Sequence, residues 1–292
     1  MKVLSLFDGI SCGMVALERA GIPVERYVAY EIEEDAIKVS KQNYPMIEQK
    51  GDVFEAKYTE GEFDLLIGGS PCTYWSIAKA GGNRETTSSG LGFDLFMQYV
   101  RALKEAKPKY FLYENNESMS DEIKDEITRQ LGVQPVMINS ADFSAQIRKR
   151  YYWTNIPVFL DYTPKEFVIE DIVFDDRYQN KTFEKYAETQ IISKDGKSVK
   201  WDSSGKGYYS QQNRARLKCM KMNTVTARGR DKCNIWLGGT KYRLMHPIEA
   251  ERLQTLPDNY TSILSSDAKR ISTIGNGWTV DVIAHIFTKL KE

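Results

Sequence analysis

Hydrophobic and polar residues alternate along the first half of the chain in a repeated strand-and-helix pattern. Short apolar runs, such as "KVLSLF" at 2–7, are followed by amphipathic segments, such as "GMVALERAG" at 13–21. Short apolar runs are typical of buried strands, and apolar residues at helical spacing are typical of the helices that connect parallel strands. The pattern therefore predicts an α/β fold with a Rossmann-like, doubly wound and mostly parallel sheet.

The remaining elements of this part follow from the same pattern. A helix is expected ahead of Pro108, because apolar residues from Phe93 to Leu103 recur at helical spacing, and Ser120 is a plausible N-cap of another helix. Further strands are expected at 27–32, near 49–54, and at 63–69, 110–115, 135–139 and 150–155, and further helices at 33–44 and 120–132.

The pattern of hydrophobic and polar residues changes after residue 160. The next stretch is polar, rich in Lys, Gly, Ser and Tyr, and lacks the strand-and-helix alternation. Order returns with "HPIEAERLQTL" and with the final "GNGWTVDVIAHIFTKLK", an apolar-faced helix after a glycine loop. We expect a catalytic domain at 1–160, a smaller domain of irregular and β structure at 161–260, and a segment at 261–292 that returns to the first domain.

Composition narrows the class of protein. The 292 residues are 41% hydrophobic and 27% charged, as in soluble globular proteins, and no apolar run is long enough to span a membrane. The chain has four cysteines without CxxC spacing and only two histidines, so its sequence indicates neither a disulfide framework nor a metal site. The start lacks the features of a signal peptide, so we expect a cytoplasmic protein.

Charge is balanced overall and uneven locally. The net charge is zero, which gives no global sign of nucleic-acid binding. One basic run between 213 and 232 is either a solvated face or a surface that follows DNA phosphates. Its candidate DNA-binding residues are Arg214, Arg216, Lys218, Lys221, Arg228 and Arg230.

The first strand leads directly into "DGISCG", the position where open α/β folds bind nucleotide-like ligands. The glycine fingerprint G-x-G-x-x-G, which serves a pyrophosphate, is missing, and this argues against a nicotinamide dehydrogenase. Glu31 follows the second strand, where such folds hold ribose hydroxyls, and Asp52 is placed to accept from an adenine amine. A ligand with ribose and adenine but no phosphates suggests S-adenosylmethionine; alternatively, Asp8 and Glu31 are solvated loop acids.

A second set of residues lies at the expected ends of other strands. Cys72 follows "GGSP" after an apolar run, where it is either a buried small residue or a nucleophile. Glu114 ends another strand, and Gln146, Arg148 and Arg150 alternate so that all three can face one way. A thiol, a carboxyl and two guanidinium groups in one crevice favour the nucleophile.

The ordered motifs resemble the cytosine-C5 DNA methyltransferase family over nearly the whole chain. Within the family, the branch most resembled is that of the de novo methyltransferases of animals, on the stretches "FDGI", "SPC", "QPVMIN", "RYYWTN" and "GNGWTVDVIAHIFTKLK". The motifs are "LFDGISCG", "GGSPC", "YENN", "QIRKR", "YRLMHPIEAERLQTLPDNY" and "GNGWTV".

The resemblance implies covalent cysteine catalysis on a cytosine flipped out of double-stranded DNA, in a protein of bacterial or phage origin. Cys72 matches the nucleophile, Glu114 the acid that engages the ring, and Arg148 and Arg150 the arginines at the target cytidine. The implied residues for S-adenosylmethionine are Phe7, Asp8, Gly9, Ile10, Ser11, Cys12, Glu31, Ile32, Asp52, Val53, Ser70, Asn276, Gly277 and Trp278.

The chain departs from the family pattern at two places. Asn116 stands where the family usually has Val, and the stretch 78–93 after the nucleophile is long and glycine-rich, as expected of a loop that closes over substrate. Two other functions remain open at this point: a tRNA cytosine-C5 methyltransferase, and a non-catalytic paralogue that binds DNA.

Overall fold

The chain forms two compact units in the structure, a computed structural model that describes residues 1–76, 84–182, 190–192, 198–201, 214–227, 233–238 and 241–291. The first unit contains Met1–Asn139, Lys149–Tyr162 and Val280–Glu292. The second unit contains Ser140–Arg148 and Thr163–Thr279. Residues 140–148 and 261–279 thus belong to the second unit, and the chain returns to the first unit at Val280.

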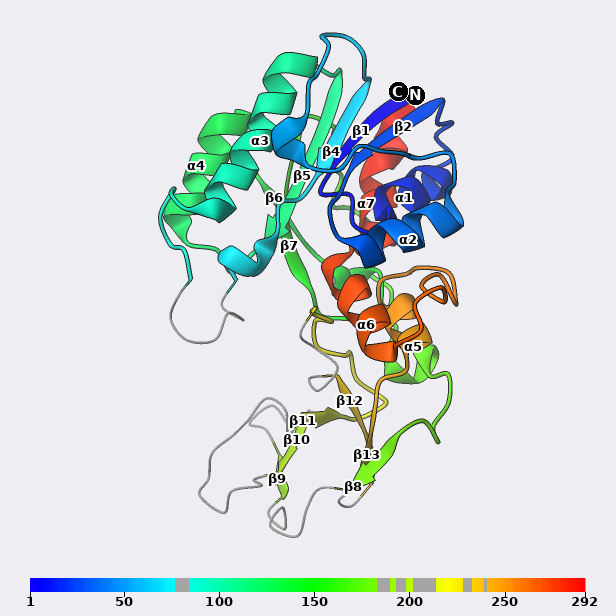
Figure 1. The fold of residues 1–292 in the computed structure, drawn as a ribbon. Helices are drawn as coiled ribbons and strands as arrows, with labels where there is room; N and C mark the ends of the chain where they lie inside the picture. Colours follow the sequence, from blue (N-terminus) through cyan, green and yellow to red (C-terminus); the bar gives the residue numbers. More distant parts are fainter. Residues whose placement is uncertain are drawn as a thin grey trace. The chain divides into compact units, whose positions relative to one another are not determined.

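A seven-stranded sheet is the centre of the first unit (Figure 1). Its order is β3-β2-β1-β4-β5-β7-β6, and all neighbouring pairs are parallel except β5–β7 and β6–β7. The mostly parallel sheet confirms the predicted fold class. The strands are β1 Lys2–Leu6, β2 Arg26–Tyr30, β3 Glu48–Gln49, β4 Leu65–Gly68, β5 Tyr110–Asn116, β6 Val136–Asn139 and β7 Lys149–Thr154.

Helices cover both faces of this sheet. Figure 1 shows α1 (Cys12–Ala20), α2 (Glu34–Asn43) and α7 (Val280–Phe287) on one side, and α3 (Leu91–Ala106) and α4 (Asp121–Leu131) on the other. Side chains from the strands and from α3 and α4, among them Leu66, Phe96 and Tyr113, form a hydrophobic core. The C-terminal helix α7 lies beside α1, where Arg19 pairs with Asp281 at 2.5 Å.

Helix α4 illustrates how local sequence sets these elements. The Ser120 hydroxyl accepts a hydrogen bond from the Ile123 amide, which confirms the predicted N-cap. Ile123, Ile127 and Leu131 recur every four residues and are buried on one face. Gly132 ends the helix with φ of 71°, a left-handed conformation that glycine adopts without strain.

Where the structure describes it, the second unit combines a six-stranded sheet with the helices α5 (Pro247–Leu253) and α6 (Asp267–Asn276). The sheet order is β8-β13-β12-β11-β10-β9, and β11–β12 is its one parallel pair among the described residues. Its strands are β8 Asn180–Thr182, β9 Gln190–Ile192, β10 Ser198–Trp201, β11 Arg214–Arg216, β12 Asn234–Gly238 and β13 Lys241–Leu244. No helix in the described part of the chain is long and apolar enough to cross a membrane.

Candidate active site

The order of the strands directs attention to the carboxyl ends of β1 and β4. These two strands are neighbours at the centre of the sheet, with Leu6 opposite Gly68. From β1 the chain continues through α1 to β2 on one side, and from β4 it continues through α3 to β5 on the other. The loops that leave this point diverge, so a crevice for a ligand is expected between them. Both Asp8 and Cys72 are in these loops.

The loop after β1 has an unusual backbone. Phe7, Gly9 and Ser11 have φ angles of 57°, 59° and 59°. Positive φ is uncommon for a residue as large as Phe, and such conformations cluster at functional sites. A Cβ at Gly9 would have no heavy atom within 4 Å, which leaves open space beside this turn. Helix α1 then starts at Cys12, and Ile10, Ser11 and Cys12 are buried.

Asp8 faces inward from this loop. Its carboxylate accepts hydrogen bonds from the hydroxyls of Ser5 at 2.6 Å, Ser11 at 2.5 Å and Tyr27 at 2.7 Å. Desolvation by burial outweighs these three hydrogen bonds and raises the pKa of Asp8 to about 6. The Asp8 carboxylate therefore links β1, the start of α1 and β2 through these hydrogen bonds.

Glu31 connects this turn to the end of β2. Its Oε2 accepts the Gly9 amide at 2.7 Å, and its Oε1 accepts the amides of Ile32 and Glu33 at 2.8 and 2.9 Å. An ionised carboxylate offers about four acceptor positions. The backbone amides occupy three of them, so the carboxylate can still accept a ligand hydroxyl.

The surroundings of Glu31 and Asp52 suit an adenosyl group. Asp52 Oδ1 accepts the Phe54 amide at 2.9 Å and caps the short turn Val53–Glu55. Next to these acids, the apolar side chains of Ile32 and Phe54 are 67% and 48% exposed. Exposed apolar side chains beside carboxylates fit a ligand with a flat apolar ring and hydroxyl groups.

Arg101 on α3 binds the backbone of the short turn Val53–Glu55 that follows Asp52. The sequence pattern did not indicate this contact. Its guanidinium donates to the carbonyls of Val53 at 2.8 Å and Ala56 at 2.9 Å, and it stacks over the ring of Tyr58. An arginine on the polar face of an amphipathic helix is ordinarily solvated, so nothing in the local sequence indicates that Arg101 binds these carbonyls.

Cys72 begins a short 3₁₀ turn, Cys72–Tyr74, directly after the loop that leaves β4. Its carbonyl accepts the amides of Trp75 at 3.1 Å and Ser76 at 2.9 Å, and its thiol is free and partly exposed. Gly68 contributes to the close packing behind it, because a Cβ there would lie 2.7 Å from the Leu6 carbonyl oxygen and 3.2 Å from the Tyr99 ring. The absence of a side chain at Gly68 therefore allows the Leu6 carbonyl and the Tyr99 ring to pack against β4.

Glu114 and Arg150 face each other on the neighbouring strands β5 and β7. Arg150 Nε lies 2.9 Å from Glu114 Oε1, and both side chains are largely buried. In the antiparallel register, Glu114 is opposite Tyr152 and Asn116 is opposite Arg150. The pair is thus presented by two neighbouring strands of the central sheet.

Ser70 ties the cysteine loop to the strand that carries Glu114. The Ser70 hydroxyl is 2.7 Å from the Tyr113 hydroxyl, and Asn115 Nδ2 donates to the Ser70 carbonyl at 3.1 Å. All three side chains are buried. Ser70 is hence bonded to both chain neighbours of Glu114, and the loop that presents Cys72 is fixed to β5.

Arg148 and Gln146 have other partners than Arg150. Strand β7 begins at Lys149, and both residues precede it and belong to the second unit. The Arg148 guanidinium is buried and donates to the carbonyls of Val225 at 2.9 Å and Gly277 at 3.0 Å. Gln146 accepts the Val225 amide at 2.7 Å. The sheet cannot impose alternation on residues that pair elsewhere.

The segment Asn276–Trp278 begins at the end of α6 and precedes α7 along the chain. Asn276 is the exposed last residue of α6, Gly277 is buried, and Trp278 is partly exposed. Gln254 Nε2 and Arg148 Nη2 both donate to the Gly277 carbonyl, at 3.1 and 3.0 Å. Side chains of the second unit therefore set the shape of this turn.

Several basic side chains of the run between 213 and 232 are already engaged by groups of the protein, so fewer of them can bind phosphates than the sequence suggests. Lys221 Nζ donates to four backbone carbonyls, those of Ala141, Ser144, Lys165 and Phe167. Lys218 pairs with Asp176, and Arg216 donates to Asn223 at 2.6 Å. Arg214 belongs to β11, while Arg228, Arg230 and part of the predicted loop, 77–83, lie outside the described residues.

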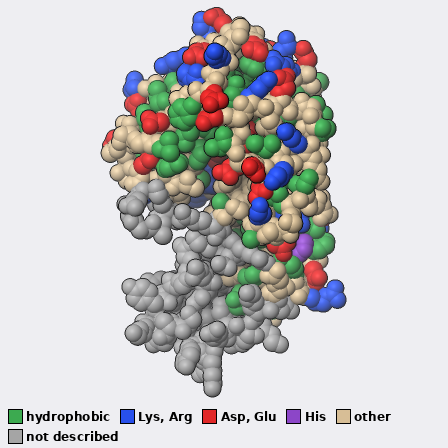
Figure 2. All heavy atoms as spheres, in the orientation of Figure 1, with side chains coloured by type: hydrophobic (Ala, Val, Ile, Leu, Met, Phe, Trp, Pro, Cys, Tyr) green, Lys and Arg blue, Asp and Glu red, His purple; other side chains and the backbone are tan. Residues whose placement is uncertain are grey.

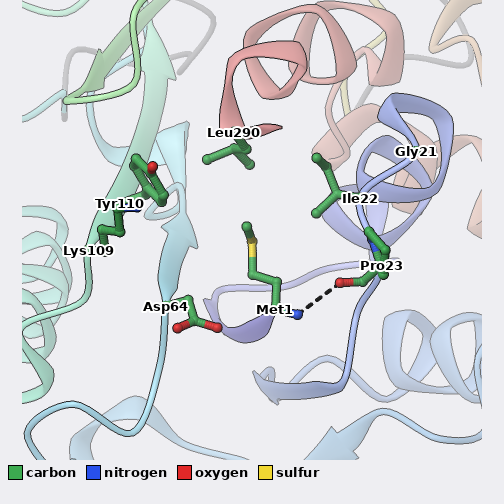
Figure 3. A pocket seen from close by; sticks show the side chains of 8 residues that line it. All are labelled: Met1, Gly21, Ile22, Pro23, Asp64, Lys109, Tyr110 and Leu290. Atoms are coloured by element: carbon green, nitrogen blue, oxygen red, sulfur yellow. Dashed lines mark hydrogen bonds between the residues drawn. The ribbon is translucent and has the colours of Figure 1, made fainter. Parts of the chain in front are cut away.

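One open pocket lies away from these groups. It has a volume of about 630 Å³ and is lined by residues such as Met1, Asp64 and Tyr110, at the amino ends of the strands (Figure 3). Among the described residues no group of three or more His, Cys, Asp and Glu side chains is placed to hold a metal ion. Figure 2 shows acidic and basic side chains interspersed over the described surface on the face that it draws.

Comparisons with known proteins agree on one family. The family model described as "C-5 cytosine-specific DNA methylase" matches residues 1–292. An orphan methyltransferase, M.SPRI of Bacillus phage SPR, is 41% identical over 118 residues, which are 39% of this chain; the match spans 26% of the phage protein. The type II methyltransferase M.FnuDI of Fusobacterium nucleatum is 26% identical over 332 aligned positions, 100% of this chain and 94% of that protein.

A solved structure shows the same fold. The Entamoeba histolytica methyltransferase EhMeth superimposes with a TM-score of 0.71, covering 100% of this chain and 99% of that chain at 15% sequence identity.

Proposed function

This chain belongs to the C-5 cytosine-specific DNA methylase family, and on that premise we propose that it methylates carbon 5 of cytosine in double-stranded DNA. The observation that carries the proposal is the arrangement at the carboxyl ends of β4 and β5. The partly exposed Cys72 thiol lies in a loop that Ser70 bonds to β5, and β5 presents Glu114 paired with Arg150.

The proposed chemistry uses Cys72 as a covalent catalyst. Carbon 5 of cytosine is a weak nucleophile, and addition of the Cys72 thiolate to carbon 6 converts the ring into an enamine-like donor. The electron pair displaced from the ring develops charge at N3, where the Glu114 carboxyl gives a proton. Arg150 stabilises that charge and holds the Glu114 carboxyl in place. Once carbon 5 has accepted a methyl group, loss of its remaining proton expels the Cys72 sulfur, N3 returns its proton to Glu114, and the aromatic ring is restored as 5-methylcytosine.

S-adenosylmethionine is the proposed methyl donor, and its sulfonium would supply an electrophilic methyl group. Glu31 would accept from its ribose hydroxyls, Asp52 from its adenine amine, and Ile32 would contact the ring. The resemblance of the motifs adds Phe7–Cys12, Val53, Ser70 and Asn276–Trp278 to this set. The Ser70 hydroxyl already has a partner in Tyr113, so its role there is to shape the loop.

The target cytosine has to leave the base stack of the duplex before this chemistry can occur. Carbon 6 of a stacked cytosine is out of reach of a thiol, so the proposal includes a base flipped out of the helix. The second unit, with its basic run, is proposed to bind the duplex. DNA carries a dense row of phosphates, and a few cations that follow it provide most non-specific affinity.

Transfer of a labelled methyl group from S-adenosylmethionine tests this proposal. Duplex DNA is expected to become labelled, and the label is expected at carbon 5 of cytosine by bisulfite sequencing. Cys72→Ser should abolish the transfer, and Cys219→Ser, which removes an exposed thiol, should retain it. Labelling of tRNA in place of DNA would contradict the substrate class, and DNA binding without labelling of either would indicate a non-catalytic protein.

A further inference from the structure

Asn116 is buried at the end of β5, and its side chain is fully engaged. Its Nδ2 donates to Asn115 Oδ1 at 3.0 Å, and its Oδ1 accepts the Ser118 hydroxyl at 2.8 Å. Only 3% of the residue is exposed. An apolar side chain of similar size, such as Val, could make neither of these two hydrogen bonds.

The hydrogen bonds form a directed series that ends at the cysteine loop. Asn115 Oδ1 accepts both the backbone amide and the side-chain amide of Asn116, at 2.8 and 3.0 Å. This leaves Asn115 Nδ2 to donate to the Ser70 carbonyl at 3.1 Å and the Tyr113 hydroxyl at 3.2 Å. If the Asn115 amide were rotated by half a turn, its Oδ1 would face the Ser70 carbonyl oxygen, and its Nδ2 would face the N–H groups of Asn116. Neither contact could be a hydrogen bond. Asn116 therefore selects the orientation in which Asn115 binds Ser70.

We propose that Asn116 is a positioning residue, which fixes Cys72 relative to Glu114 by locking the Asn115 amide onto the Ser70 carbonyl. The inference rests on the proposed function, since it assigns a role at the same site. Strand β5 continues to Asn116, whereas its last pairing with β4 is at Tyr113 and Gly68. No backbone ladder therefore joins the cysteine loop to β5 beyond this pair, and the side chains take over that connection.

A loop held by side chains can shift by more than a loop held by a ladder, and a small displacement of a nucleophile has a large effect on rate. Asn116→Val keeps the size of the residue and its backbone amide, but removes both side-chain hydrogen bonds, the one to Asn115 Oδ1 and the one from the Ser118 hydroxyl. We expect kcat to fall by about tenfold, while KM for duplex DNA and for S-adenosylmethionine stays within about twofold. A value of kcat within twofold of wild type would overturn the proposal.

Asn155→Ala provides the matched control for stability. The Asn155 side chain also bonds to the backbone of β5, accepting the Phe111 amide and donating to the Lys109 carbonyl, both at 2.9 Å, but at the opposite end of the strand. This variant should lower the unfolding midpoint and leave kcat within about twofold. An equal loss of kcat in both variants would show a general effect of stability and contradict positioning.

A double-mutant cycle tests the route through Asn115. In the background of Asn115→Ala, the further change Asn116→Val should have no additional effect on kcat, because the group through which it acts is gone. Additive losses would contradict the route.

Alkylation of Cys72 by iodoacetamide gives a readout that needs no methyl transfer, and Cys219→Ser removes the competing exposed thiol. A loosened loop should raise the alkylation rate of Asn116→Val by about threefold or more over Cys219→Ser alone. Equal rates would overturn positioning even in a protein without activity. Absence of methyl transfer by the wild-type protein would contradict the proposed function and leave the alkylation result to decide the inference.

Discussion

Arg150 Nε lies 2.9 Å from Glu114 Oε1, across the antiparallel pair β5 and β7, and both side chains are largely buried. A buried carboxylate that loses its guanidinium partner becomes costly, and a guanidinium without its carboxylate loses its orientation. The two residues therefore form one functional group, and changing either should impair the same step.

Glu114→Gln tests the carboxyl of this pair. The amide keeps the shape but cannot give a proton to N3 of cytosine, so we expect kcat to fall by about 10²–10⁴. Single-turnover methyl transfer at saturating DNA measures the change. Glu126→Gln is the control, since Glu126 pairs with Arg129 on α4 and is expected to leave kcat within about twofold. A similar kcat for Glu114→Gln and wild type would remove Glu114 from the mechanism.

The two arginines of "QIRKR" should separate into different roles. Arg148→Met removes the side-chain donor to the Val225 carbonyl and leaves the Gly277 carbonyl with Gln254 as its side-chain donor, so we expect a loss of about 2–4 kcal/mol in the free energy of unfolding. Arg150→Met should instead lower kcat with a smaller change in stability. Urea unfolding and single-turnover kinetics on both variants measure the two effects, and the reverse assignment would contradict the structure.

Lys221 should contribute to stability more than to DNA affinity. Its ammonium group binds four backbone carbonyls, and partial burial lowers its pKa. Lys221→Met should cost about 1–3 kcal/mol in the free energy of unfolding. It should leave unchanged the slope of log K for DNA against log salt concentration, because no phosphate contact is lost. A slope smaller by about one unit would show that Lys221 contacts a phosphate.

Asp8 should make stability depend on pH in a defined direction. Burial raises its pKa from 3.8 to about 6, so the unfolded chain releases the proton at lower pH than the folded protein does. The stabilising contribution is complete below the unfolded pKa and is lost as the pH rises through about 6. Relative to Asp8→Asn, the wild type should therefore lose unfolding free energy between about pH 4 and pH 7, as measured by urea titrations. An equal pH profile for the two proteins would contradict the burial of this carboxyl.

Strands, helices and the position of the cysteine follow from the sequence because they depend on local signals. The apolar run that ends in "GGSPC" and the cap at Ser120 are contained in a few residues, and the sheet uses them as expected. Glu114 and Arg150 lie on β-strands of one sheet, as expected, whereas the pairing of their side chains is seen only in the structure.

The functions of buried polar residues were not predictable in the same way. Alternation indicated one face for Gln146, Arg148 and Arg150, yet the chain passes from one unit to the other before Lys149. Lys221 and Arg101 look like solvated cations in the sequence, and distant backbone carbonyls give them their structural roles. Such contacts depend on how separate segments meet, which no local pattern contains.

Trapping on DNA that contains 5-fluorocytosine tests the central claim, covalent catalysis by Cys72, most directly. Fluorine at carbon 5 cannot leave as a proton does, so the bond between the Cys72 sulfur and carbon 6 should persist after methyl transfer. With S-adenosylmethionine and a duplex carrying 5-fluorocytosine, the account predicts an adduct that survives denaturation, maps to Cys72 by mass spectrometry and is absent in Cys72→Ser. Methyl transfer to ordinary duplex DNA without such an adduct, or an undiminished adduct in Cys72→Ser, would contradict it.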